Sequence, residues 1–363
     1  RGDARGTTMT QRTALIMAGG TGGHVYPAMA VADALLVQGW KVVWLCTEGG
    51  MENRLITNKP YQKAMISMRG VRGKGYLGWL LLPFKLLVAF SQSAQAMRQH
   101  QPDVVLGMGG FAAFPGGLMA KLLGKQLVIH EQNSVAGLTN KVLAPLANKV
   151  LAAFPAAFGA KALLLGNPVR ADICAIAEPA QRAKGRRGPL RLLVVGGSLG
   201  AQALNEVLPF ALAQLDKKDR PIVVHQAGEK HIANLTQRYQ QLAVEAEPKA
   251  FIDDMAAMYA WADLLICRAG ALTVAELSAA GVASLLVPFP HAVDDHQTGN
   301  AHYLSDAGAA ILIPQAEFTV GKVAALLQGM TREQCLDMAI KARSLGMPEA
   351  TNKVASICME LAA

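Results

Sequence analysis

Short runs of apolar residues alternate along the chain with glycine-rich turns and with longer stretches whose apolar residues recur at helical spacing. The first run, Ala14–Ala18, stops at residues 19–23, a helical pattern covers residues 27–38, and a second run occupies Lys41–Cys46. Runs this short and uniformly apolar are typical of strands buried on both faces of a parallel sheet. The order strand, glycine turn, helix, strand therefore predicts an α/β domain.

The same pattern begins again at Arg191. An apolar run at Leu192–Val195 is followed by glycines within residues 196–200 and by a helical pattern over residues 201–215. Further strands are predicted at Val104–Leu106, Leu127–His130, Ile222–His225, Leu264–Cys267 and Ser284–Val287. The sequence thus predicts two Rossmann-like domains with parallel sheets and a cleft between them.

Composition and pattern together suggest where the domains end. We expect a first domain over residues 9–170 and a second over residues 191–345. Residues 171–190 are rich in arginine, lysine, glycine and proline without an apolar period, which indicates a surface linker. Residues 346–363 are expected to form a helix that packs back toward the first domain.

Charge and cysteine content narrow the classes of partner. The net charge of +9 favours anionic partners, but no stretch combines many basic residues with aromatic ones, which argues against nucleic acid. The 5 cysteines are odd in number and form no closely spaced pair, as expected of a protein from a reducing compartment. Without an HExxH or DxD motif, and with the acidic residues at 294–295 simply adjacent, we expect no metal and no cofactor.

Two glycine turns are candidates for phosphate binding. Gly19–Gly23 and Gly196–Gly200 each follow a predicted strand and precede a helix, where free backbone N–H groups and the helix dipole attract anions. One such loop could equally be only a tight turn, whereas two equivalent loops favour phosphate. A nicotinamide dehydrogenase would need GxGxxG, and Val25 and Leu199 stand where that pattern requires glycine. Glu48, after the second strand, is the one residue that supports the dehydrogenase.

A carboxylate follows the strand Leu264–Cys267 within residues 268–276. Glu276 could accept hydrogen bonds from both hydroxyls of a ribose while the adjacent helix end faces a diphosphate. Alternatively, Thr273 and Glu276 have the spacing of a capping box, and this fragment alone favours the cap.

Histidine and a polar cluster supply candidate catalytic groups. His24 directly follows the first glycine turn and could act as a general base, or could only hold that turn. The residues His130–Asn133 end a strand with four polar side chains, a position that commonly lines a ligand crevice. A polar loop at residues 294–300 could contact a sugar, and residues 107–111 form a third glycine turn.

Seven motifs follow one another in order along nearly the whole chain: GGTGGH (19–24), GMGGF (107–111), HEQN (130–133), GNPVR (166–170), GGSLGA (196–201), FIDDM (251–255) and RAGALTVAE (268–276). Taken together, these motifs resemble the MurG family, the UDP-N-acetylglucosamine:lipid I N-acetylglucosaminyltransferases of bacterial peptidoglycan synthesis. The resemblance implies a GT-B fold and an inverting reaction without metal, from the donor UDP-GlcNAc and the acceptor lipid I to lipid II.

The resemblance also implies roles for individual residues. Ile252 would lie at the uracil, Glu276 at the ribose, and Ser198 with residues 271–273 near the diphosphate. Gln297 would reach the donor sugar or the ribose. Of the catalytic candidates, His24 is the first choice as base and Glu131 the second. The full donor set implied by similarity is Thr21, Gly22, Gly23, Asn133, Arg170, Ser198, Ile252, Ala271, Leu272, Thr273, Val274, Ala275, Glu276 and Gln297.

An apolar stretch with a basic border predicts peripheral binding to an anionic membrane. The resemblance implies that this membrane is the bacterial inner membrane, bound at its cytoplasmic face. The stretch is too short for a membrane span, and the alternative is an ordinary buried helix. The membrane-associating candidates are Arg72, Lys74, Trp79, Leu80, Leu81, Phe84 and Lys85.

The resemblance also makes proteins of cell-wall synthesis or division candidate partners. The open alternatives for function are a nucleotide-sugar epimerase, a nicotinamide-dependent oxidoreductase and a non-catalytic basic scaffold.

Overall fold

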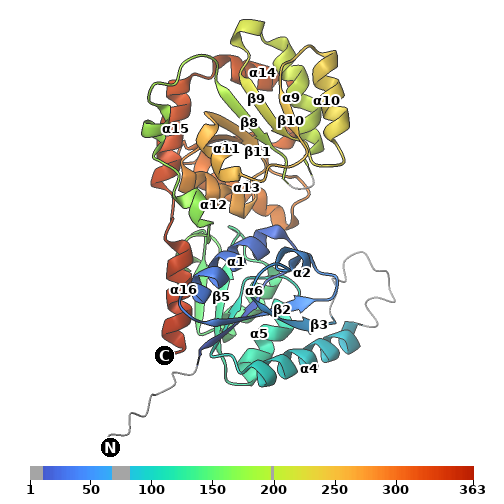
Figure 1. The fold of residues 1–363 in the computed structure, drawn as a ribbon, viewed down its shortest axis with the longest axis vertical. Coiled ribbons are helices and arrows are strands. Elements are labelled where there is room, and N and C mark those ends of the chain that lie inside the picture. Colours follow the sequence, from blue (N-terminus) through green and yellow to red (C-terminus); the bar gives the residue numbers. More distant parts are fainter. Residues whose placement is uncertain (1–10, 68–81, 198–199) are drawn as a thin grey trace, which may run out of the picture. The chain divides into compact units, whose positions relative to one another are not determined.

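The computed structural model describes residues 11–67, 82–197 and 200–363, which form two compact units (Figure 1). Unit 1 contains the chain through Gln132, together with Ala136–Pro168 and Glu349–Ala363. Unit 2 contains Asn133–Val135 and Val169–Pro348. The two parallel-sheet α/β domains expected from the sequence are confirmed.

Unit 1 is built on a seven-stranded parallel sheet with the order β3-β2-β1-β4-β5-β6-β7. Its strands are β1 (Thr13–Met17), β2 (Lys41–Thr47), β3 (Gln62–Ile66), β4 (Val104–Gly107), β5 (Gln126–Glu131), β6 (Lys149–Ala152) and β7 (Leu163–Leu164). Its α-helices in the described residues are α1 (Gly22–Val37), α2 (Met51–Leu55), α4 (Leu82–His100), α5 (Ala113–Leu122), α6 (Leu138–Leu143) and α16 (Ala350–Leu361).

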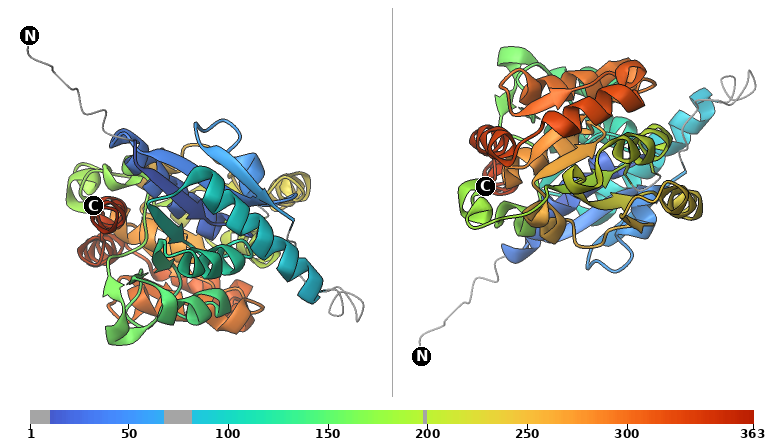
Figure 2. Two further views of the ribbon diagram at one scale, coloured as in Figure 1. Left: turned by 90° about the horizontal axis from the view of Figure 1, so that it is seen from below. Right: turned by 90° about the horizontal axis from the view of Figure 1, so that it is seen from above.

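Alternate residues of the central strand β1 enter two different cores of unit 1. Ala14 and Ile16 pack with apolar residues of α1 and α16, whereas Leu15 and Met17 pack with residues of α4, α5 and α6. The helices accordingly cover both faces of the sheet (Figures 1 and 2). A strand that is apolar on both sides is therefore what this position requires, and the uniformly apolar run of the sequence satisfies it.

Unit 2 repeats this plan with a six-stranded parallel sheet of order β10-β9-β8-β11-β12-β13. Its strands are β8 (Arg191–Val195), β9 (Ile222–Gln226), β10 (Glu247–Lys249), β11 (Leu264–Cys267), β12 (Ala283–Leu286) and β13 (Ala310–Leu312). Its α-helices in the described residues are α7 (Ala171–Cys174), α8 (Pro179–Ala183), α9 (Gln202–Gln214), α10 (Ile232–Gln241), α11 (Met255–Trp261), α12 (Ala271–Ala280), α13 (His296–Ser305), α14 (Val320–Gly329) and α15 (Arg332–Ser344). The largest core cluster joins the sheet to α9, α10, α14 and α15.

Residues 171–190 are not merely the surface linker that their composition suggested, because they contain α7 and α8 and belong to unit 2. Two arginines of this segment bond it to the rest of unit 2. Arg182 donates to the carbonyl oxygen of Ala280 at 2.6 Å, and Arg186 pairs with the buried carboxylate of Asp263 at 2.6 Å. The polar composition reflects these bonds to backbone and buried carboxylate, which an apolar periodicity cannot reveal.

The C-terminal helix α16 belongs to unit 1 and packs against α1. Val354 and Cys358 are fully buried there, in the same cluster as Val31 and Leu35 of α1. In the three described ranges, no helix combines the length and the apolar character needed to cross a bilayer.

Candidate active site

Each sheet has a point where the chain returns to the middle and continues on the other side. In unit 1 this switch lies between β1 and β4, and in unit 2 between β8 and β11. Ligands of open α/β sheets bind outside the carboxyl ends of the strands at such a point. Residues 19–24 and 108–111 follow β1 and β4, and residues 196–201 and 268–276 follow β8 and β11. These four motifs therefore lie at the switch points, two in each unit.

The first glycine turn of unit 1 leads directly into α1. Gly20 has φ +87°, a conformation that favours glycine, and Thr21 is the N-cap residue without a capping bond from its side chain. Gly22 and Gly23 are the first two helical residues, so their N–H groups have no partner within the helix. The turn is a suitable anion site.

The turn after β4 packs directly on this first turn. Gly110 has φ +90°, and a Cβ atom there would collide with the backbone of Gly19. Gly109 has φ +96°, and a Cβ atom there would come within 3.1 Å of the His24 ring. Glycine at both positions lets two backbones and one imidazole ring approach closely.

His24 lies in the first turn of α1 and is half-buried. Its Nδ1 atom is 2.7 Å from Oε1 of Gln132, a residue that follows β5. Since an amide oxygen can only accept, His24 donates its Nδ1 proton to Gln132. The other ring nitrogen, Nε2, is then the basic one in the neutral imidazole.

Glu131, the second candidate base, has another role in the structure. Its side chain is buried, and its Oε2 atom accepts hydrogen bonds from Gly137 N at 3.0 Å and Asn140 Nδ2 at 2.8 Å. These bonds connect the end of β5 to the start of α6. A carboxylate held inside the protein in this way is poorly placed to accept a proton from a substrate, so the geometry favours His24.

In unit 2 the helix α12 begins earlier than the capping-box interpretation requires. Its N-cap residue is Gly270 and its first helical residue is Ala271, so Thr273 lies inside the first turn. The capping box of Thr273 and Glu276 is therefore wrong. The N–H groups of Ala271, Leu272 and Thr273 have no helical partner, whereas Val274 already donates to the carbonyl oxygen of Gly270 and Ala275 follows within the helix.

Glu276 is buried inside unit 2, close to the start of α12. Its Oε2 atom accepts a hydrogen bond of 2.8 Å from the Tyr259 hydroxyl, and among the described residues no donor reaches Oε1. Burial raises the pKa of Glu276 to about 7, although the Tyr259 hydrogen bond and the positive charge of Arg170 act in the opposite direction. A buried carboxylate with one free oxygen is suited to a ligand that brings its own donors.

Gln226, at the end of β9, connects two of the predicted donor loops, and the sequence interpretation missed it. Its Nε2 atom donates to the carbonyl oxygen of Gly197 at 2.9 Å, and its Oε1 atom accepts from Ile252 N at 3.1 Å. The glycine turn after β8 and the residue expected at the uracil are thereby held together. A polar residue at the carboxyl end of a strand is the signal that could have identified it. Ser198 lies outside the described residues.

Asn133 and Gln297 both belong to unit 2 and both have protein partners. Asn300, fully buried in α13, donates to the Asn133 side-chain oxygen at 3.3 Å and accepts from Ser134 N at 2.8 Å. Gln297 accepts from Phe289 N at 2.9 Å, which leaves its amide nitrogen for a ligand. Arg170, the N-cap residue of α7, is partly exposed and 3.8 Å from Asp172.

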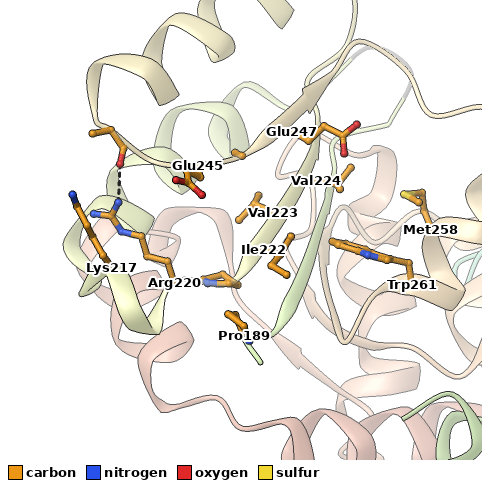
Figure 3. A pocket seen from close by; sticks show the side chains of 13 residues that line it. Pro189, Lys217, Arg220, Ile222, Val223, Val224, Glu245, Glu247, Met258 and Trp261 are labelled. Atoms are coloured by element: carbon orange, nitrogen blue, oxygen red, sulfur yellow. Dashed lines mark hydrogen bonds between the residues drawn. The ribbon is translucent and has the colours of Figure 1, made fainter. Parts of the chain in front are cut away.

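A cavity of about 670 Å³ lies elsewhere in unit 2, beside the amino ends of β9 and β10 (Figure 3). Ile222, Glu247 and Trp261 line it (Figure 3). The guanidinium group of Arg220 there donates to the carbonyl oxygens of Leu215, Ala243 and Ala213, so each of its three nitrogens already has a partner. This cavity is far along the strands from the motif loops. Over the described ranges, no group of three His, Cys, Asp or Glu residues could hold a metal.

Comparison with known proteins places both units in one family of enzymes. The N-terminal domain of glycosyltransferase family 28 matches residues 14–152, and the C-terminal domain of the same family matches residues 191–357. The solved structure of Acinetobacter baumannii MurG is similar with a TM-score of 0.86 and 42% identity, covering 96% of this chain and 99% of that one.

Two curated relatives cover nearly the whole chain. A protein of Nitrosospira multiformis is 56% identical over 97% of this chain and 99% of its own length. A protein of Cupriavidus metallidurans is 57% identical over 98% of this chain and 99% of its own. Both are named UDP-N-acetylglucosamine–N-acetylmuramyl-(pentapeptide) pyrophosphoryl-undecaprenol N-acetylglucosamine transferase.

Proposed function

Because the chain belongs to glycosyltransferase family 28 and, within it, to the MurG family, we propose that it transfers N-acetylglucosamine from UDP-GlcNAc to lipid I, giving lipid II. The acceptor group is the 4-hydroxyl of the N-acetylmuramyl sugar. The names of its relatives favour this transferase over a nucleotide-sugar epimerase or a nicotinamide-dependent oxidoreductase. The observation in this chain that carries the proposal is that α12 contains both kinds of ligand-binding group. Glu276 has a carboxylate oxygen that no donor reaches among the described residues, and the N–H groups at the start of the same helix have no helical partner.

In this proposal unit 2 binds the nucleotide. Glu276 accepts hydrogen bonds from the ribose hydroxyls, while the N–H groups of residues 271–273 face the diphosphate. Ile252 borders the uracil, and the two hydrogen bonds of the Gln226 side chain hold Ile252 beside the glycine turn after β8. Arg170 adds positive charge near the same carboxylate.

Unit 1 supplies the base in the proposed reaction. The 4-hydroxyl oxygen attacks the anomeric carbon, the bond from that carbon to the phosphate oxygen breaks, and UDP leaves with the electron pair. The hydroxyl proton moves to Nε2 of His24, the ring nitrogen that carries no proton when Nδ1 donates to Gln132. One displacement inverts the configuration at the anomeric carbon. Amide groups at the helix starts stabilise the charge that grows on UDP, as an oxyanion hole does.

A transfer assay tests the reaction directly. We expect the full chain to move labelled GlcNAc from UDP-GlcNAc to a lipid I analogue, with UDP released in equal amount. The control omits the acceptor. If an isomeric sugar nucleotide forms in that control, the protein is an epimerase, and if the acceptor stays unlabelled under all conditions, the transferase proposal fails.

The start of α4 supports the proposal that unit 1 binds a membrane surface. Phe84 and Leu87 are 68% and 65% exposed, Val88 is 48% exposed, and their spacing puts them on one side of the helix. Lys85 is exposed beside them. Apolar side chains with a neighbouring cation suit the interface of an anionic bilayer, where the lipid-linked acceptor resides. Arg72, Lys74, Trp79, Leu80 and Leu81 lie outside the described residues.

Vesicle sedimentation tests the membrane proposal. We expect binding to anionic vesicles that weakens at high salt, since each basic residue near the surface contributes roughly 1 kcal/mol. Replacing Phe84 and Leu87 together by serine should reduce binding severalfold. Val37→Ser is the matched control, because Val37 is 83% exposed at the end of α1. Binding that ignores lipid charge, or that responds equally to the control, would assign the membrane contact to another surface.

A further inference from the structure

His130 is a buried histidine that the proposed reaction does not use. It lies at the carboxyl end of β5, is fully buried, and stands two residues before Gln132, the partner of His24. Its Nε2 atom is 2.9 Å from the carbonyl oxygen of Gly166. Its Nδ1 atom is 3.0 Å from Nε2 of Gln132. The three side chains therefore form one continuous chain of hydrogen bonds in unit 1, from the Gly166 backbone to His24.

Two backbone carbonyl groups fix the direction of every bond in this chain, because a carbonyl oxygen can only accept. The Gly166 oxygen requires a proton on His130 Nε2, so His130 Nδ1 of the neutral ring is an acceptor. The Gln132 amide nitrogen donates both to that Nδ1 atom and to the His130 carbonyl oxygen at 2.9 Å, which fixes the orientation of the amide. The Gln132 oxygen consequently faces His24 Nδ1 at 2.7 Å.

Burial of His130 keeps this arrangement neutral. Desolvation lowers the pKa of His130 to about 4, against a smaller raising effect of the Gly166 hydrogen bond and of the Glu131 charge. A protonated His130 would have no acceptor left at Nδ1, and the Gln132 amide would have to turn. At neutral pH the side chains of His130 and Gln132 thus have a single arrangement of protons.

We propose that His130 and Gln132 are positioning residues, which hold His24 in the tautomer protonated at Nδ1 and so leave Nε2 free to take the acceptor proton. The proposal rests on the role of His24 as base. Neutral histidine in water favours the other tautomer, with the proton on Nε2, which could not accept a proton there. The hydrogen bonds that lead from Gly166 to His24 therefore select the tautomer that a free imidazole does not favour. The third member of a catalytic triad acts on its histidine in the same way.

A direct test measures the tautomer itself. Nitrogen-15 NMR of the full chain labelled at histidine, with His24 assigned through the His24→Ala variant, distinguishes the protonated from the unprotonated ring nitrogen. We expect a protonated Nδ1 in the wild type and a shift toward protonated Nε2 in Gln132→Met, which keeps the side-chain length but removes the amide. A wild-type His24 protonated at Nε2 would overturn the proposal, whatever the enzyme assay shows.

Turnover supplies the second test. Gln132→Met should lower kcat about 10- to 100-fold, because a displaced catalytic group can lose that much, with little change in the KM for UDP-GlcNAc. In the His24→Ala background the same substitution should lower kcat by less than about twofold, because it acts only through His24. Equal losses in both backgrounds would show a merely structural role. If Gln132→Met does not fold, His130→Phe tests the same chain from its other end.

The control is Gln92→Met. Gln92 also lies in unit 1 and uses both halves of its amide, with its oxygen accepting from Ser67 N and its nitrogen donating to the Ser67 hydroxyl. We expect its kcat to stay within about twofold of the wild type. If His24→Ala itself leaves turnover intact, the assignment of the base fails, while the NMR result still decides whether Gln132 sets the tautomer.

Discussion

The two units share a sheet topology but differ in what their strands carry at the switch point. Unit 1 has an imidazole in the first turn of α1, bonded to an amide and backed by a second buried imidazole. Unit 2 has no histidine in the first turn of α12 and instead a buried carboxylate bonded to a tyrosine. Under the proposed function, the same backbone plan would move a proton in unit 1 and bind a nucleotide in unit 2, depending on the side chains at the strand ends.

The largest expected effect belongs to unit 1 and to turnover alone. His24→Ala should lower kcat roughly a hundredfold or more, the loss typical of removing a general base. The affinity for UDP, measured by calorimetry, should change by less than about twofold. A variant that turns over normally but binds UDP weakly would mean that His24 binds the donor and is not the base.

Next in size is a change in unit 2 that acts on binding. Glu276→Ala should weaken UDP binding by about 1.5–3 kcal/mol, or roughly 10- to 150-fold, because a charged acceptor for the ribose is lost. Calorimetry of the variant measures this loss. Glu276→Gln is the matched control for size and should lie between the two proteins. Unchanged affinity in Glu276→Ala would remove the ribose contact from the proposal.

A smaller effect follows from the pKa of Glu276, which burial raises to about 7. Ribose hydroxyls donate to the ionised carboxylate, so bound ligand lowers this pKa and affinity increases as pH rises through about 7. The Kd for UDP-GlcNAc should be about tenfold higher at pH 6 than at pH 8. The intact sugar nucleotide is the right probe, since its diphosphate does not titrate in this range. The pH dependence should flatten in Glu276→Gln, and its persistence there would assign it to another group.

The smallest expected effect is none at all. Transfer activity should survive exhaustive chelation, because the sequence has no DxD motif and the proposed partners of the diphosphate are the N–H groups at the start of α12. Activity that disappears with the chelator and returns with magnesium or manganese would mean that a cation shares this task.

The central strands were predictable because each is apolar on both faces, as Ala14–Ala18 and Leu264–Cys267 illustrate. The strands β3, β6, β7, β10 and β13 were missed. Four of them, β3, β7, β10 and β13, lie at the edges of the two sheets. β3 begins with the exposed residues Gln62 and Lys63, β10 begins with the exposed Glu247, and both residues of β7 are exposed, so no long apolar run marks these strands. Periodicity detects burial, and a short edge strand has little of it.

The candidate site was likewise predicted only in part from sequence patterns. His24 and Glu276 could be selected from motif and spacing, but the partner of each could not. Tyr259 lies 17 residues before Glu276, and Gln132 lies 108 residues after His24. The capping box failed for a related reason: where α12 starts depends on where β11 ends, and Gly270 rather than Thr273 occupies the N-cap position.

The tripeptide Asn133–Val135 has a consequence for dividing the protein into fragments. It belongs to unit 2, although the residues on both sides of it belong to unit 1. A fragment of residues 169–348 would therefore lack Ser134, whose N–H group is the donor to the fully buried Asn300 oxygen. An unsatisfied buried acceptor costs about 1–3 kcal/mol, a large part of the stability of a domain this size. Unit 2 is thus not a contiguous module, and a truncation that follows the sheet boundaries alone would remove part of its own interior.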